Sequence, residues 1–195
     1  KKFNKTKISV GGQNSHQAKN YGAFTGSISP KMLKDLGCKF VILGHSENRA
    51  SGENNHQINK KIHSALNKNL KVIFCIGETL KEKRKKITYS ILRKQINVGL
   101  KGVKNFHNIL IAYEPVWSIG TGVIPSKNEL ESNVNEINKL LFKRTKIKLP
   151  ILYGGSVNSK NISSLRNIEG ISGFLVGSAS LSSKKFIDII KKTIN

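Results

Sequence analysis

Several residue types and patterns are scarce in this 195-residue chain, and each scarcity excludes a class of protein. Only two cysteines are present, Cys38 and Cys75, so a disulfide framework is excluded and buried, reduced thiols are expected. No run of about 18 apolar residues occurs, so no segment is expected to span a membrane. No signal-peptide pattern opens the chain, and because it begins with Lys1 we expect that its natural start is missing. These features predict a cytoplasmic protein.

Acidic residues are also scarce, since 11 Asp and Glu face 34 Lys and Arg, which gives a net charge of +23. Such a charge raises the possibility of a nucleic-acid-binding protein. However, only five of the basic residues are arginine, and the densest basic run, residues 81–86, contains no aromatic side chain. Nucleic-acid readers usually favour arginine and stacking rings. We therefore interpret the lysines as solvated faces, and a basic nucleic-acid binder remains the lesser alternative.

Signals for metals and cofactors are missing too. Four histidines lie in polar loops or on helical patterns without metal-ligand spacing, namely His16, His56, His63 and His107. No G-x-G-x-x-G sequence follows the first expected strand, which argues against a dinucleotide site. We expect neither a metal nor a cofactor.

Short apolar runs alternate with helical patterns along the whole chain. The runs predict strands at residues 8–12, 40–43, 72–76, 109–113, 150–153 and 173–176. Helices are expected at residues 30–37, 55–67 and 80–100, from the capping box 126–129, at 158–165 and from 177–178 onward. This alternation predicts an α/β fold of parallel strands in one domain covering 1–195. A doubly wound open sheet and a (β/α)₈ barrel that lacks two units both fit.

One carboxylate stands directly after an expected buried strand. Glu114 follows the run 109–113 and precedes a loop, 115–123, that contains an aromatic residue and glycines. Enzymes of parallel α/β folds place catalytic groups at the carboxyl ends of strands, so Glu114 is a candidate base and the loop a candidate lid. The alternative is a solvated glutamate beside a packed Trp117.

His45 follows another expected strand, 40–43. Proton abstraction beside a carbonyl needs a carboxylate base and a hydrogen-bond donor for the developing enediolate oxygen. A neutral imidazole at His45 could be that donor, because a helix starting near Ser46 would disfavour the imidazolium. The alternative is a histidine that is merely satisfied at a strand end.

Two glycine-bearing turns follow the last two expected strands, at residues 154–156 and 177–178. Their backbone N–H groups could bind an anion, and a helix beginning at the second turn would add its N-terminus. In barrels, phosphate is commonly bound by the loops after the last two strands. The alternative is that these glycines only permit tight turns.

Six motifs in order resemble the triosephosphate isomerase family: GAFTGSISP, VILGHSENR, CIGE, AYEPVWSIGTG, YGGSVN and GFLVGSASL. The similarity extends from about residue 8 to the C-terminus. It implies a (β/α)₈ TIM barrel lacking its first two βα units, with six of eight present. It also implies isomerisation of dihydroxyacetone phosphate and D-glyceraldehyde 3-phosphate, without a cofactor.

The resemblance implies a role for individual residues. Glu114 corresponds to the base and His45 to the electrophile, while Glu47 supports the site. Residues 15–27 correspond to a loop that docks into a second subunit, which implies a homodimer in which Thr25 approaches the neighbour's site. The positions whose N–H groups would bind phosphate are Gly120, Ser156, Gly177 and Ser178.

The chain departs from the family pattern in several places, and one of them is the loop after Arg49, which is one residue shorter than usual. The family's first strand carries an Asn and a Lys that contact substrate, and neither has a counterpart here. Ser178 replaces a glycine, and Asn48 replaces the first of two arginines, although Glu53 still matches the family. Because a barrel without two adjacent strands would expose two unpaired edges and part of its core, we expect the chain alone to be inactive. A catalytically inactive remnant of the same fold remains the alternative to an incomplete isomerase.

Overall fold

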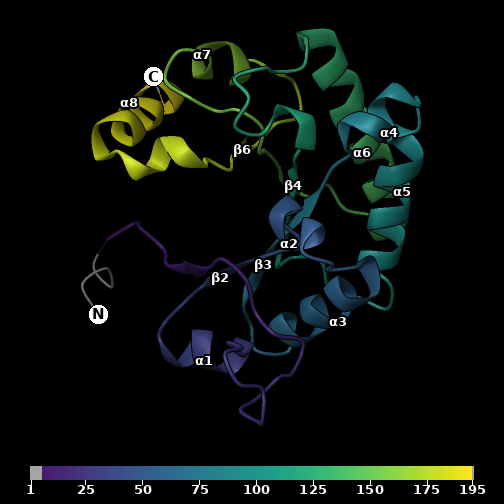
Figure 1. The fold of residues 1–195 in the computed structure, drawn as a ribbon, viewed down its shortest axis with the longest axis vertical. Coiled ribbons are helices and arrows are strands. Elements are labelled where there is room, and N and C mark those ends of the chain that lie inside the picture. The colour runs from purple at the N-terminus through teal and green to yellow at the C-terminus, as the bar shows by residue number, and fades with distance from the viewer. Residues whose placement is uncertain (1–5, 195) are drawn as a thin grey trace. The chain divides into compact units, whose positions relative to one another are not determined.

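The structure is a computed structural model that describes residues 6–194 (Figure 1). The chain divides into two compact units, one formed by Lys1–Cys75 with Gln95–Leu110 and one by Ile76–Lys94 with Ile111–Asn195. Strands and helices alternate in both units, as the sequence predicts. All strand pairs described within each unit are parallel.

The first unit contains strands that pair in chain order. Its elements are β1 (Gly11–Gly12), α1 (Pro30–Asp35), β2 (Phe40–Leu43), α2 (Ser46–Ala50), α3 (Asn55–Leu66) and β3 (Lys71–Ile76). Phe40 of β2 pairs with Gly11 on one side and with Lys71 on the other. Fully buried side chains from β2, β3 and α3 form the core of this unit, including Val41, Leu43, Ile58, Ile62 and Phe74.

Local sequence explains where α1 begins and ends. The Ser29 hydroxyl accepts a hydrogen bond from the backbone N–H of Met32, and Pro30 occupies the first turn, where its missing N–H is not needed. Gly37 follows the helix with a φ of +86°, a conformation that side chains other than glycine rarely adopt. The predicted helix boundaries are therefore confirmed here.

The first predicted strand is shorter than expected. Only Gly11 and Gly12 pair with β2, while Ile8 and Val10 are exposed. Gly12 lies against α1, since a Cβ atom at Gly12 would be 2.7 Å from Cδ1 of Leu33. The prediction of a strand over 8–12 was thus wrong at its start.

The second unit contains the candidate lid, residues 115–123, and most of the candidate site residues. Its elements are α4 (Leu80–Arg84), the first part of α5 (Thr88–Gly99), β4 (Ile109–Tyr113), the 3₁₀ turn η1 (Val116–Ser118), α6 (Lys127–Thr145), β5 (Ile151–Tyr153), α7 (Ile162–Leu165), β6 (Gly173–Phe174), the 3₁₀ turn η2 (Ser178–Leu181) and α8 (Ser183–Ile194). The chain passes between the units within β3, α5 and β4. Tyr113 and Tyr153 are the largest side chains in the core of this unit.

The single lysine-rich helix predicted over 80–100 is two helices. The chain breaks between α4 and α5 at Lys86, which has a φ of +59°. Ile87, predicted on the inner face, is 38% exposed, whereas Leu92 is buried. The helical period continues through the break, so the pattern of apolar residues did not reveal it.

Three further boundaries differ from the predictions. α7 begins at Ile162, because the Asn158 side chain accepts N–H bonds from Lys160 and Asn161 in a turn before the helix. β6 ends at Phe174. The turn 177–178 does not enter a long helix directly, because η2 comes before α8.

The start of α6 forms only half of the predicted capping box. The Ser126 hydroxyl accepts from the N–H of Glu129, at 3.2 Å. The Glu129 carboxylate instead forms an ion pair with Lys83 of α4, at 2.6 Å. The carboxylate therefore joins α6 to α4 rather than to its own N-cap.

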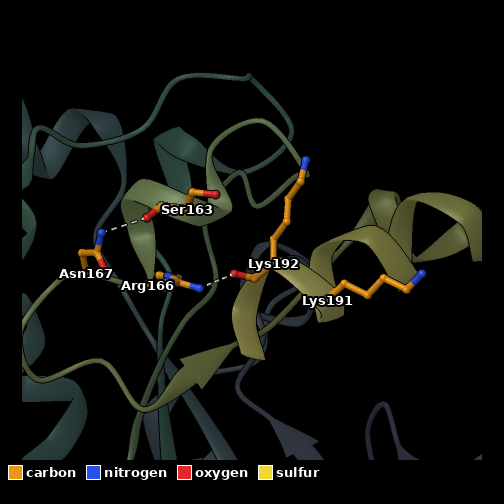
Figure 2. A pocket seen from close by; sticks show the side chains of 5 residues that line it. All are labelled: Ser163, Arg166, Asn167, Lys191 and Lys192. Atoms are coloured by element: carbon orange, nitrogen blue, oxygen red, sulfur yellow. Dashed lines mark hydrogen bonds between the residues drawn. The ribbon is translucent and has the colours of Figure 1, made fainter. Parts of the chain in front are cut away.

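Helix α8 packs beside α7 and leaves part of its apolar surface uncovered. Ile189 is buried, whereas Phe186, Ile187, Ile190 and Ile194 are exposed. Arg166, which follows α7, donates from Nη1 to the carbonyl oxygen of Lys192 at 2.9 Å (Figure 2). This bond satisfies a carbonyl group near the C-terminus of α8 that has no partner within its own helix.

Replacing Arg166 by alanine is expected to loosen the end of α8. One hydrogen bond from a charged donor is lost, so the free energy of unfolding should fall by about 1.5 kcal/mol. Thermal unfolding and amide hydrogen exchange in 188–194 would measure this effect. Asn167→Ala is the matched control, because within residues 6–194 the Asn167 side chain bonds to the carbonyl oxygen of Ser163 in α7 and not to α8. Equal exchange in both variants would contradict the expectation.

No helix in the described part of the chain combines the length and the apolar character needed to cross a membrane.

Candidate active site

Glu114 lies directly after β4 in the second unit. Its residue is only 3% exposed. Its backbone N–H donates to the carbonyl oxygen of Ile76 at 2.7 Å, which continues the pairing beyond the end of the strand. The carboxylate is therefore carried by backbone that continues the sheet.

Two glycines make room for Glu114. A Cβ atom at Gly77 would lie 1.7 Å from the Glu114 carbonyl oxygen, so only glycine allows this close approach of the two backbones. A Cβ atom at Gly154 would lie 2.9 Å from Cγ and 3.4 Å from Oε1 of Glu114. The base candidate and the glycine turn after β5 are thus in direct contact.

The start of the candidate lid is hydrogen-bonded to a second buried carboxylate, Glu78. The indole N–H of Trp117 donates to Oε1 of Glu78 at 2.9 Å, and the Tyr113 hydroxyl donates to Oε2 at 3.2 Å. Asn133 of α6 donates in turn to the Tyr113 oxygen at 2.9 Å. Trp117, at the start of the candidate lid, is therefore part of a hydrogen-bond network with groups after β3, at the end of β4 and on α6.

A lysine lies over the ring of Trp117. The Lys83 ammonium lies 3.4 Å from the centroid of the Trp117 ring and also pairs with Glu129. A cation over an indole face is favourable, most of all when the cation is partly desolvated. The interpretation of the whole lysine run as a solvated face was therefore wrong for Lys83, which is only 31% exposed at its side chain.

Burial raises the pKa of the Glu78 carboxyl above its ordinary value, although its bonds from Trp117 and Tyr113 oppose the shift. Burial of the Tyr113 hydroxyl raises its pKa as well, and the neighbouring Glu78 charge raises it further. A carboxyl whose pKa is higher in the folded than in the unfolded state stabilises the fold at low pH. That contribution is complete below about pH 4 and is lost as the pH rises through the folded-state pKa.

Glu78→Gln is therefore expected to raise the melting temperature at pH 7. The amide stays neutral, so it avoids the cost of burying a charge and can still bind Trp117 and Tyr113. Melting curves from about pH 4 to pH 8 should show the advantage of the variant shrinking toward the acidic end. Glu136→Gln on the outer face of α6 is the control. The difference between its melting temperature and that of the parent should not shrink toward acidic pH. A constant difference for Glu78→Gln would refute the linkage.

The tip of the lid and the two glycine turns lie around the carboxyl ends of β4, β5 and β6. Gly120 is exposed at the tip with a φ of +70°, and a Cβ atom there would meet nothing within 4 Å. Ser156 is half-buried in the turn after β5, while Gly177 and Ser178 are exposed after β6. Because these strands are parallel, all four predicted anion-binding positions lie at the same edge of the second unit as Glu114.

His45 belongs to the first unit, where it follows β2 and caps α2. Its Nδ1 accepts a hydrogen bond from the N–H of Glu47 at 3.3 Å, so in the neutral ring Nε2 carries the proton. Arg49 fixes the same turn, since its Nε donates to the Gly44 carbonyl at 2.7 Å and its Nη2 to the Cys75 carbonyl at 2.9 Å. The predicted helix start after His45 is confirmed.

Glu47 and Thr25 are also placed in the first unit. The Glu47 carboxylate is largely exposed and lies 3.9 Å from Nδ1 of His45. Thr25 lies at an exposed turn of the loop 15–27. The ends of this loop meet, because the His16 N–H donates to the Ile28 carbonyl at 2.7 Å.

A polar cluster lies at the base of that loop. Asn14 donates to Asn48 at 3.1 Å and accepts from the Lys61 ammonium at 3.0 Å, and Lys61 also pairs with Glu53. Oε2 of Glu53 is buried without a hydrogen-bond partner among the described residues. The neutral Asn48 therefore contributes a hydrogen bond to this cluster but no charge.

The second unit brings together Glu114, the lid and both glycine turns, whereas His45, Glu47 and Thr25 lie in the first unit. Sequence reasoning assigned no role to Glu78, Tyr113, Ser118 or Lys83. Glu78 stood at a strand end and could have been singled out by that position. Within residues 6–194, no group of three or more potential metal ligands occurs.

Comparisons with known proteins agree with the motifs. The family model described as triosephosphate isomerase matches residues 1–193. Triosephosphate isomerase from Thermodesulfovibrio yellowstonii is 44% identical over 191 residues, which cover 95% of this chain and 77% of that protein. The enzyme of this name from Carboxydothermus hydrogenoformans is 45% identical over 96% of this chain and 77% of its own length. The one from Yarrowia lipolytica is 43% identical over 97% and 78%. The chain belongs to the triosephosphate isomerase family.

Proposed function

We propose that this protein interconverts dihydroxyacetone phosphate and D-glyceraldehyde 3-phosphate through an enediolate. The observation that carries the proposal is the placement of Glu114, a buried carboxylate on backbone that continues the sheet, in contact with the glycine turn after β5. In this role Glu114 removes a proton from one substrate carbon and returns it to the neighbouring carbon. Its burial supports the assignment, because a site that excludes water protects a reactive enediolate from side reactions.

His45 serves as the electrophile in this proposal. Its Nδ1 accepts from the Glu47 N–H, so in the neutral ring the proton lies on Nε2, the atom that would donate to a carbonyl oxygen. A neutral donor suits an enediolate, because it stabilises the developing negative charge without giving up its proton permanently. By resemblance to the family, His45 and Glu114 act on the same substrate molecule.

The substrate phosphate is proposed to bind backbone N–H groups of Gly120, Ser156, Gly177 and Ser178. Oriented N–H groups in a water-poor site bind phosphate oxygens well. Ser178 is exposed, so its side chain has space to turn away from the anion. Gly120 would join the other three when the lid closes over the phosphate and excludes water.

The rest of the proposal concerns the whole protein. We infer one domain, a TIM barrel of eight βα units of which this chain supplies the last six, working in the cytoplasm without metal or cofactor. We further infer a homodimer in which the loop 15–27 docks into the second subunit and Thr25 approaches its active site. The exposed side chains of Tyr21 and Phe24 on this loop support a docking role.

The test is an isomerase assay on two chains. The first is the 195-residue chain, and the second, the extended chain, is the same sequence preceded by the N-terminal segment of the Thermodesulfovibrio yellowstonii relative. The extended chain is expected to interconvert the two triose phosphates, and the 195-residue chain to be far slower, because the family's lysine and asparagine are absent from it. No turnover by a folded extended chain would favour the inactive remnant.

A further inference from the structure

Ser118 ends the turn η1 at the start of the lid, and its hydroxyl contacts three separate segments. It lies 2.6 Å from the carbonyl oxygen of Val123 at the far end of the lid and 3.2 Å from the hydroxyl of Tyr153 on β5. It also lies 3.5 Å from the backbone nitrogen of Ser156 in the glycine turn. Ser118 is completely buried, so water does not compete for these bonds.

The direction of each bond follows from proton counting. A hydroxyl has one proton to donate and two lone pairs that accept. The Val123 carbonyl can only accept, so the Ser118 proton is directed to it. The hydroxyl of Tyr153 and the N–H of Ser156 must then both donate to the Ser118 oxygen. All three bonding positions of the hydroxyl are used.

Gly155 makes this arrangement possible. A Cβ atom at Gly155 would lie 2.1 Å from the Tyr153 hydroxyl oxygen and 2.8 Å from Oγ of Ser118. Only glycine therefore lets the turn fold closely over the two hydroxyls and bring the next N–H, that of Ser156, to Ser118. The lid and the glycine turn are joined at this point.

The bond from Ser156 is the longest of the three and the easiest to replace. At 3.5 Å it lies at the outer limit of a hydrogen bond. A phosphate oxygen carries charge and accepts shorter and stronger hydrogen bonds than a neutral hydroxyl. Since an N–H has a single proton, a bound phosphate would take it from Ser118.

We propose that Ser118 is a positioning residue that couples the anion site at the glycine turn to the lid. A phosphate-type anion that binds the Ser156 N–H removes the one bond between Ser118 and that turn, so the lid stays joined to Tyr153 of β5 but no longer to the glycine turn. The proposal rests on the proposed function, because it takes Ser156 as a phosphate ligand. It assigns the trigger of lid movement to one hydroxyl rather than to the substrate carbons.

The proposal predicts a gain of anion affinity when the hydroxyl is removed. In Ser118→Ala the Ser156 N–H has no internal acceptor to leave, so inorganic phosphate should bind about threefold more tightly. Trp117, the single tryptophan of the chain, is the neighbour of Ser118 and reports the lid by its emission. The emission of ligand-free Ser118→Ala should resemble that of the parent chain saturated with phosphate.

The experiment titrates the 195-residue chain with inorganic phosphate at constant ionic strength and follows Trp117 emission. Ser164→Ala, which removes an exposed hydroxyl bonded to Asn161, should behave like the parent. Lys191→Ala should too, and it controls for anions that bind the basic pocket shown in Figure 2. Ser118→Cys, nearly equal in size and a weaker acceptor, should shift affinity in the same direction and provides the test if the alanine variant does not fold.

The outcomes separate the two proposals. Tighter phosphate binding with an altered emission of the ligand-free variant supports the coupling. Unchanged affinity and emission in both Ser118 variants, with saturable binding by the parent, overturns the coupling and leaves the proposed function intact. If the parent chain shows no saturable phosphate binding, the coupling and the proposed anion site both fail.

Discussion

Replacing Glu114 by glutamine is expected to lower kcat for isomerisation in the extended chain on the order of 10³-fold. Glutamine has nearly the same shape and cannot accept the proton from carbon. The residue is buried between the backbone at Gly77 and the turn at Gly154, so the amide can fill the same space. KM should change little, because the phosphate contacts lie elsewhere. A coupled assay of initial rates in both reaction directions measures the effect.

Two further variants make this result specific. Glu114→Asp keeps the charge but draws it back by one methylene, so kcat should fall between those of the parent and of Glu114→Gln. Glu136→Gln, on the outer face of α6 and paired with Lys139, removes a glutamate charge without touching the site and should keep full activity. A Glu114→Gln enzyme within a few-fold of the parent would remove Glu114 from the role of base.

Replacing Gly77 by alanine should damage both stability and catalysis. The added methyl would lie 1.7 Å from the carbonyl oxygen of Glu114, and backbone cannot move aside as cheaply as a side chain. The free energy of unfolding should fall by about 3 kcal/mol. If the fold survives by shifting the end of β4, the displaced carboxylate should reduce kcat about a hundredfold. Denaturant unfolding and steady-state kinetics of the extended chain measure the two effects.

Gly177→Ala provides the comparison for the stability effect. A Cβ atom at Gly177 meets nothing within 4 Å. Its midpoint of unfolding should therefore fall much less than that of Gly77→Ala. Equal loss of stability in both variants would mean that the loss reflects glycine replacement in general and not the close approach to Glu114.

The strand pattern was predictable because apolar runs carry it directly. The strands 40–43 and 109–113 were predicted with the boundaries observed for β2 and β4. Fully buried strands are apolar on both faces, so their ends are marked by the first polar residue or glycine. Glu114 stands immediately beyond such an end, and His45 stands one residue later. For this reason both could be singled out from the sequence.

The break between α4 and α5 could not be predicted from the same pattern. Lys86 adopts a left-handed conformation that sequence usually marks with glycine or asparagine, and the apolar period continues past it. The Glu78 and Ser118 networks escaped prediction for another reason. Glu78 lies 35 residues from Tyr113 and 39 residues from Trp117 in the chain, and Ser118 lies 35 residues from Tyr153. Only the tertiary fold brings these residues into contact.

The uncovered apolar side chains of α8 affect how the molecule behaves at high concentration. A net charge of +23 keeps copies of the chain apart while the solution is poor in ions. Added salt shortens the range of that repulsion to about 10 Å at 0.1 M, and the exposed Phe186, Ile187 and Ile190 then come within reach of one another. The colloidal stability of this chain therefore decreases as the ionic strength rises, so dilute buffers preserve single copies better than concentrated salt.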